Sequence, residues 1–286
     1  MADDPARSVG AVYQRLRASL REAGVATPEL DARMLVGEVA GIEPSQLPLH
    51  LENRLSNAEL AVVAGFAAQR LDGKPVGRIL GKREFWGLEF QLNDATLEPR
   101  PDTETLVEAV LRHLPANAAP VLADVGTGSG AIAIALLHEV KGAHCLAVDI
   151  SAQALQQACA NAARHGVAER FWPVQGDYLD AVGPQIDWII SNPPYIATSV
   201  VAGLEGEVRL HDPNRALDGG ADGLAAYRAL AARAAVILPK GGRIALEIGY
   251  DQADSVVKLL QKSDFKDIEI VQDLAGQDRV IVALRQ

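Results

Sequence analysis

Apolar residues in the first 73 positions recur every three or four residues, which is the spacing of helices with one buried face. Glycines at the ends of these runs, and Ser56 and Glu59 at capping-box spacing, mark where helices end and begin. The pattern predicts three helices, at residues 8–22, 27–41 and 56–73. We therefore expect residues 1–73 to form a small, all-helical N-terminal domain.

The pattern changes between residues 74 and 98. Glycines, aromatic residues and alternating apolar positions replace the helical spacing in this stretch. Alternation with a period of two is typical of strands rather than helices. We expect residues 74–98 to form a β-hairpin linker that joins two domains.

Strand-like and helical runs alternate from residue 99 to residue 286, which we expect to form one further domain. Such alternation predicts an α/β fold with a doubly wound, mostly parallel sheet that helices cover on both faces. The last two strands follow one another without a helix and indicate an antiparallel edge. Residues 192–221 are expected to be a long loop. The expected strands are 121–125, 144–149, 171–175, 186–191, 243–248, 268–272 and 279–284, and the expected helices are 103–114, 129–139, 152–165, 223–237 and 252–263.

Composition excludes several classes of protein. Apolar residues make up 49% of the 286, which excludes a mainly disordered chain. The longest apolar run, Ala131–Leu137, is far shorter than the roughly 20 residues of a membrane span, and the acidic start of the chain lacks the apolar region of a secretory signal. Two cysteines and six scattered histidines form no disulfide framework and no metal-ligand pattern. We expect a cytoplasmic protein without a metal site and without membrane contact.

A glycine-rich turn follows the expected strand 121–125. Its residues are Gly126, Thr127, Gly128, Ser129 and Gly130, and an apolar helix begins directly after it. Glycines allow a tight turn and the close approach of a ligand, and the helix offers free backbone N–H groups. Asp149 ends the next strand, where a carboxylate binds ribose hydroxyls. The spacing fits either an adenosyl ligand or a dinucleotide.

Two other residues bear on that choice. Asp124 lies two residues before the first glycine, and its negative charge suits a cationic ligand, such as a sulfonium, better than a pyrophosphate. Tyr178 follows the third strand, where an aromatic ring can contact an adenine. An aromatic residue at the boundary of the core, half buried in it, explains Tyr178 equally well.

A second motif follows the apolar strand that ends at Ser191. It reads Asn192-Pro193-Pro194-Tyr195, and its two prolines stiffen the backbone. The Asn192 side-chain oxygen and a backbone carbonyl can accept hydrogen bonds from an NH₂ group, and Tyr195 can stack on its plane. The motif thus suits a planar nitrogen substrate, although a plain turn would have the same residues.

The order of GTGSG, Asp149 and NPPY resembles methyltransferases that act on exocyclic or amide nitrogens. That group includes adenine-N6 DNA methyltransferases and protein-glutamine N5 methyltransferases, and the second is the closer match. The segments REFWGLEF, LEPRPDTE, DPNRALDGGADGL, LEIGYDQ and DLAGQDRV resemble the bacterial release factor glutamine methyltransferase family over residues 70–286. A sister family modifies a ribosomal protein, but Pro99–Thr103 and Ala216–Gly220 favour the release factor family. Glu98 stands where that family usually has an apolar residue.

The resemblance implies a class I methyltransferase sheet and S-adenosylmethionine as the cofactor. It implies methyl transfer to the side-chain amide nitrogen of the glutamine in the GGQ motif of class I peptide chain release factors. An N-terminal helical domain would help to bind this protein partner, or would only stabilise the catalytic domain. The chain is expected to be a monomer.

The resemblance also implies the role of each site residue. Asn192 and Pro193 would accept the amide hydrogens, and Pro194 and Tyr195 would contact the substrate. Arg100 and Thr103 lie where the family's linker closes over the cofactor, although Thr103 could equally be a helix N-cap. The cofactor itself would be bound by Gly126, Thr127, Gly128, Ser129, Gly130, Asp149, Tyr178 and Asn192.

Three other functions stay open on the sequence. An adenine-N6 DNA methyltransferase would need a basic surface, whereas the net charge is −10 and the loop 192–221 holds Arg209 and Arg215 as its only arginines or lysines. No direct DNA binding is therefore expected. A NAD-dependent dehydrogenase leaves NPPY unexplained, and a non-enzymatic adaptor needs neither motif.

Overall fold

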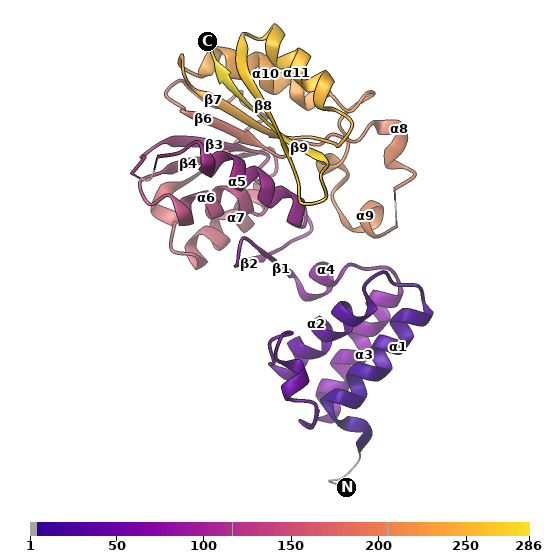
Figure 1. Cartoon of the computed structure of the whole chain (residues 1–286). Helices are drawn as coiled ribbons and strands as arrows, with labels where there is room; N and C mark the ends of the chain where they lie inside the picture. The colour runs from indigo at the N-terminus through magenta and orange to yellow at the C-terminus, as the bar shows by residue number, and fades with distance from the viewer. Residues whose placement is uncertain (1–4, 116, 205) are drawn as a thin grey trace. The chain divides into compact units, whose positions relative to one another are not determined.

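The structure is a computed structural model that describes residues 5–115, 117–204 and 206–286. It divides into two compact units, Met1–Gly81 and Lys82–Gln286 (Figure 1). This division falls after Gly81, whereas we expected boundaries at residues 73 and 98. Among the described residues, no helix is long and apolar enough to cross a membrane.

The first unit is helical. Its helices are α1 (Val9–Glu22), α2 (Pro28–Ala40), α3 (Asn57–Leu71) and α4 (Val76–Leu80), with 3-10 turns at Pro5–Arg7 and Leu47–Leu49. Ser8 caps α1, and the predicted capping box of Ser56 and Glu59 begins α3. We expected extended backbone where the short helix α4 lies. Five residues are too few to show a helical period, so the sequence pattern did not predict this helix.

The expected hairpin is shorter than predicted and belongs to the second unit. Its strands are β1 (Lys82–Phe85) and β2 (Leu88–Gln91), and Trp86 and Gly87 between them both have positive φ, of 55° and 68°. Two consecutive residues with positive φ form a two-residue hairpin turn whose twist matches that of the flanking strands. Phe85 and Phe90 are almost fully buried in the core of this unit. The hairpin is therefore packed structure and not a free linker.

A seven-stranded sheet forms the centre of the second unit. Its strands are β3 (Val121–Val125), β4 (His144–Asp149), β5 (Phe171–Gln175), β6 (Trp188–Ser191), β7 (Arg243–Glu247), β8 (Phe265–Gln272) and β9 (Asp278–Arg285), in the order β5-β4-β3-β6-β7-β9-β8. β9 is antiparallel to both its neighbours, while β3 to β7 are parallel. The edge strand β8 pairs antiparallel with β9, which confirms the expected antiparallel edge. The strand order reverses at β3 and β6, where such sheets bind their ligands.

Helices cover both faces of this sheet (Figure 1). On one face, α5 (Glu104–Arg112), α6 (Ala131–Glu139) and α7 (Ala152–Arg164) contribute to one apolar cluster. On the other face, α10 (Ala225–Ile237) and α11 (Ala253–Lys262) contribute to a second. The expected loop 192–221 contains two short helices, α8 (Thr198–Val201) and α9 (Gly206–His211). Further 3-10 turns lie at Pro101–Thr103, Ala168–Arg170 and Asn214–Ala216.

One buried polar side chain connects the hairpin to the glycine-rich turn. Asn161 of α7 is fully buried. Its Oδ1 accepts a hydrogen bond from the Gln91 N–H at 3.0 Å, and its Nδ2 donates to the carbonyls of Gln91 and Ser129 at 3.0 and 2.8 Å. Because Ser129 is part of the turn, this side chain sets where the turn lies against the hairpin.

Replacement Asn161→Ala should lower the free energy of unfolding by about 1–3 kcal/mol, because it leaves buried backbone groups without partners. Chemical denaturation of the purified protein measures this change. Gln156→Ala, on the exposed side of the same helix, should change it by less than about 0.5 kcal/mol. Equal effects of the two substitutions would contradict the role given to Asn161.

Candidate active site

A cavity of about 390 Å³ lies at the carboxyl ends of β3, β4 and β6. Residues from all of the predicted motifs line it. They include Gly126 and Gly128 of the turn, Asp149, Tyr178, and Asn192, Pro193 and Pro194 of the second motif. The fold therefore brings together segments that lie far apart in the sequence. Their individual roles stay predictions.

The backbone of the glycine-rich turn requires its glycines. Gly126, Gly128 and Gly130 have φ values of 76°, 55° and 83°, where a side chain is strained. A Cβ on Gly130 would also lie 2.9 Å from Ile134 Cδ1. The N–H groups of Gly126 and Thr127 both donate to the Val148 carbonyl, at 2.8 and 3.0 Å. The turn is therefore held against β4, beside the cavity.

Asp124 has a different place from the one we expected. It is fully buried and does not line the cavity. Its Oδ2 accepts hydrogen bonds from the Thr127 hydroxyl at 2.7 Å and from the Ala133 N–H at 3.2 Å, and burial raises its pKa to about 7. The expectation that its charge faces a cationic ligand is wrong for this structure. Asp124 instead holds the glycine-rich turn onto α6.

Asp149 reaches the cavity from the end of β4. Its two carboxylate oxygens accept hydrogen bonds from the backbone N–H groups of Gly128 and Ser151, each at 2.9 Å. These bonds fix the orientation of the carboxylate. Tyr178 lines the cavity nearby with a φ of 45°, and burial raises its pKa. A carboxylate and an aromatic ring thus line the same cavity.

The second motif begins at the carboxyl end of β6. The Ser191 hydroxyl donates to the Val125 carbonyl at 2.6 Å, which connects β6 to β3. The side-chain N–H of Asn192 donates to the Thr103 hydroxyl at 3.2 Å, and no donor among the described residues binds its Oδ1. Thr103 precedes α5 but makes no side-chain capping bond. Its hydroxyl oxygen instead accepts the hydrogen bond from Asn192.

Tyr195 does not line the cavity, although we expected it to contact the substrate. Its side chain packs against the second apolar cluster, and burial raises its pKa to about 12. The Tyr195 carbonyl accepts a hydrogen bond from Gln252 Nε2 at 2.9 Å. In this structure, Tyr195 anchors the motif to the core.

Glycines let a second segment pack directly against the motif. Ile196 pairs with Asp218 as an isolated bridge. A Cβ on Gly219 would lie 2.8 Å from the Pro194 oxygen, and one on Gly223 would lie 2.4 Å from the Tyr195 oxygen. These contacts explain the residues LDGGADG, whose structural role our sequence reasoning did not find. The close contacts of these glycines and the hydrogen bond from Gln252 to the Tyr195 carbonyl together restrict the conformation of the motif.

Arg100 and Glu98, which precede α5, each form an ion pair. The Arg100 guanidinium lies 2.5 Å from the buried Asp212 carboxylate and connects the segment before α5 to the segment after α9. Glu98, the departure from the family pattern, is also buried and lies 3.2 Å from Arg83 of β1. It neither lines the cavity nor points to solvent.

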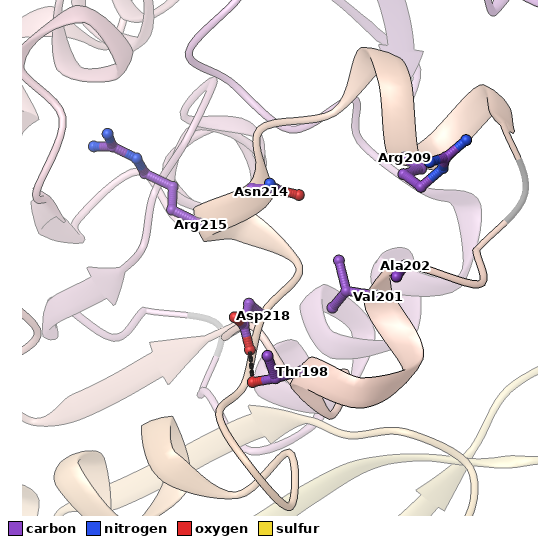
Figure 2. A pocket seen from close by; sticks show the side chains of 7 residues that line it. All are labelled: Thr198, Val201, Ala202, Arg209, Asn214, Arg215 and Asp218. Carbon is purple, nitrogen blue, oxygen red and sulfur yellow. Dashed lines mark hydrogen bonds between the residues drawn. The ribbon is translucent and has the colours of Figure 1, made fainter.

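A second cavity, of about 520 Å³, adjoins the first and shares Arg215 and Asp218 with it (Figure 2). The Asp218 carboxylate accepts hydrogen bonds from the Thr198 hydroxyl at 2.7 Å and from the Gly220 N–H at 2.9 Å. Arg209 and Arg215 add two positive charges to its wall. This second space lies beside the NPPY motif.

Two family models match this chain, one in each unit. Residues 101–220 match the family described as methyltransferase small domain, and residues 11–81 match the PrmC N-terminal domain. A methyltransferase structure from Pyrococcus furiosus has the same fold, with a TM-score of 0.53 at 15% identity over 78% of this chain and 98% of that chain. The second unit is thus a Rossmann-like methyltransferase domain.

Curated relatives match nearly the whole chain. The release factor glutamine methyltransferase of Agrobacterium fabrum is 43% identical over 97% of this chain and 98% of its own length. That of Bradyrhizobium diazoefficiens is 45% identical over 97% of this chain and 95% of its own length. The chain belongs to the release factor glutamine methyltransferase family, and it is a methyltransferase that uses S-adenosylmethionine.

The cavity fits this cofactor. The fixed carboxylate of Asp149 would accept hydrogen bonds from ribose hydroxyls, and Tyr178 and Ile150 would form an apolar wall for the adenine. The glycine-rich turn lies beside β3, close enough for the methionine part to approach its backbone. Bound S-adenosylmethionine supplies a methyl group activated by a positively charged sulfur.

Replacement Asp149→Ala should raise the Kd of S-adenosylmethionine roughly 10- to 100-fold, the cost of losing charge-assisted hydrogen bonds. Isothermal calorimetry measures the Kd, and thermal melting checks that the glycine-rich turn has not unfolded. Asp180→Ala, whose carboxylate is 75% exposed, is the matched control and should leave the Kd unchanged. An unchanged Kd in Asp149→Ala would refute this role.

Proposed function

We propose that this enzyme transfers the methyl group of S-adenosylmethionine to the side-chain amide nitrogen of the glutamine in the GGQ motif of class I peptide chain release factors. The observation that supports this most directly is the setting of Asn192. Its NH₂ group donates to Thr103, so its Oδ1 is left as an acceptor, and the residue lines the cavity together with the glycine-rich turn.

Methyl transfer to an amide nitrogen depends more on the orientation of the amide than on its activation by an acid or base. An amide nitrogen is a poor nucleophile because its lone pair is delocalised into the carbonyl. Asn192 Oδ1 and the Pro193 carbonyl would each accept one amide hydrogen and aim the nitrogen at the methyl carbon. Holding two reactants in attack geometry lowers a barrier by up to roughly 7–11 kcal/mol. The stiff prolines and the close contacts of Gly219 and Gly223 support such a fixed geometry.

The second cavity offers room for the polypeptide on either side of the target glutamine. It adjoins the cofactor cavity, and its arginines can donate to backbone carbonyls or acidic side chains. The first unit would contribute further contacts to the release factor. The proposal includes a monomeric enzyme that acts in the cytoplasm, where its substrate functions. It includes no direct DNA binding, in line with the net charge of −10.

A methyl-transfer assay tests this proposal. Purified enzyme and labelled S-adenosylmethionine are offered an unmodified release factor, the same factor with its GGQ changed to GGA, a ribosomal fraction and duplex DNA. We expect label only on the factor with an intact GGQ. Label on the ribosomal fraction or on DNA, with none on the release factor, would refute the proposed substrate.

Replacement Asn192→Ala should lower methyl transfer at least 100-fold, because the amide loses the acceptor that orients it. The Kd of S-adenosylmethionine should stay within about threefold of wild type, since Asp149 and the turn are untouched. Asn117→Ala, at an exposed position, is the control. Near-normal turnover of Asn192→Ala would contradict the role of this side chain.

A further inference from the structure

Two of the sequence segments that resemble the release factor methyltransferase family have no role in the function described so far. LEIGYDQ runs from β7 to the residue before α11, and DLAGQDRV contains the turn between β8 and β9. Each segment presents one apolar side chain to solvent. Tyr250 is 66% exposed, and Leu274 is fully exposed. Because single exposed apolar residues are ordinary, their place and their rigidity decide whether they have a function.

The sheet brings both residues to the edge at which the cofactor cavity lies. β6 and β7 are parallel, so the NPPY motif and the segment with Tyr250 leave the sheet at the same edge. β9 runs the opposite way and its first residues pair with the end of β7, so the β8–β9 turn also lies there. β7 and β9 are one and two strands from β6, roughly 5 and 10 Å. A protein interface of standard size, about 800 Å² on each partner, would cover the cavity mouth and both turns.

Hydrogen bonds connect the turn that carries Tyr250 to the NPPY motif. The Gln252 N–H donates to the Gly249 carbonyl at 2.9 Å, and Gln252 Oε1 accepts from the Gly249 N–H at 3.0 Å. Gln252 Nε2 donates to the Tyr195 carbonyl at 2.9 Å. The Tyr227 hydroxyl donates to Gln252 Oε1 at 3.2 Å. This turn therefore has a fixed place relative to the motif.

Asp273 closes the turn that carries Leu274. Its N–H donates to the Gln277 carbonyl at 2.9 Å. Its Oδ1 accepts hydrogen bonds from the N–H groups of Ala275 and Gln277, at 2.9 and 3.0 Å. Gly276 completes the turn with a φ of 77°. Leu274 thus projects from a tight turn that is hydrogen-bonded on both sides.

Arg279 joins the two turns. Its guanidinium donates to the Asp273 carboxylate at 3.0 and 3.1 Å and to the Ile248 carbonyl at 3.3 Å. The Ile248 N–H donates in return to the Arg279 carbonyl at 2.8 Å. The Arg279 side chain is only 12% exposed, so these contacts lie largely out of water. One frame of hydrogen bonds therefore holds Tyr250, Leu274 and the NPPY motif.

We propose that Tyr250 and Leu274 form a docking surface for apolar side chains of the release factor, outside its GGQ motif. This inference rests on the proposed function, which names the release factor as the substrate. The surface is continuous, through Gln252, with the motif that would bind the target glutamine, and this continuity favours the substrate protein as its occupant. Side chains that are already fixed lose little freedom on binding, and tyrosine is enriched among the residues that carry binding energy.

The experiment measures methylation of unmodified release factor by Tyr250→Ala, Leu274→Ala and the double variant. We expect the KM for release factor to rise roughly 5- to 30-fold in each single variant, the effect of an important interface residue. The kcat and the Kd of S-adenosylmethionine should stay within about threefold, because the cavity is untouched. Val236→Ala is the control. Val236 is 74% exposed near the end of α10 that leads into the amino end of β7, at the opposite edge of the sheet.

Direct binding separates docking from catalysis. Calorimetry with the release factor whose GGQ is changed to GGA measures a Kd without turnover, and this Kd should rise with the KM. An unchanged KM and Kd in the double variant overturn the inference, as does a fall in kcat at unchanged KM. Thermal melting checks folding, which substitutions at such exposed positions should leave nearly unchanged. If an alanine variant melts early, Tyr250→Ser and Leu274→Ser replace it.

Two further outcomes distinguish the inference from the proposed function. Wild type that neither binds nor methylates release factor refutes the proposed function, and the docking surface with it. Wild type that methylates release factor no better than the double variant overturns the docking surface alone. Sedimentation tests the competing occupant. A wild-type dimer that the double variant loses would assign the surface to a second copy of this chain and overturn the inference.

Discussion

The pairing of β3 with β6 is the constraint on which the active site depends. Their register places Val125 opposite Ser191, and the Ser191 hydroxyl binds the Val125 carbonyl at 2.6 Å. The next residue along each strand, Gly126 and Asn192, therefore enters the same cavity. Because both strands run in the same direction, their carboxyl ends meet at one edge of the sheet, where the strand order reverses. The glycine-rich turn and the NPPY motif meet for this reason.

Around this junction, the protein buries polar groups that a core would otherwise exclude. Asp124 holds the glycine-rich turn, Asn161 holds the same turn to the hairpin, and Thr103 binds Asn192. Each buried polar group costs free energy unless it is paired, and the hydrogen bonds that pair these groups also fix the geometry around the cavity. Fixed geometry is what transfer to a weak amide nucleophile requires.

Much of the site could be predicted because its motifs are local. The turn needs glycines at Gly126, Gly128 and Gly130 for its own backbone, and NPPY is stiff within four residues. Other positions depend on distant partners. Asp124 lies against α6 and outside the cavity, and the Tyr195 side chain packs against the second apolar cluster. Glu98 forms an ion pair with Arg83, and Gly219 packs against the Pro194 carbonyl. No local sequence pattern predicts these contacts.

The sequence by itself determined the alternation of strands and helices, the two motifs and their order, because hydrophobic period and backbone restriction act over a few residues. The short helices α4, α8 and α9 were not predicted, because each is shorter than the stretch of sequence over which a helical period becomes visible. Only the tertiary structure decided that β9 lies between β7 and β8, and that Thr103 contacts Asn192. Such contacts join residues far apart in the chain, and burial and hydrogen bonding select them only once the sheet has formed.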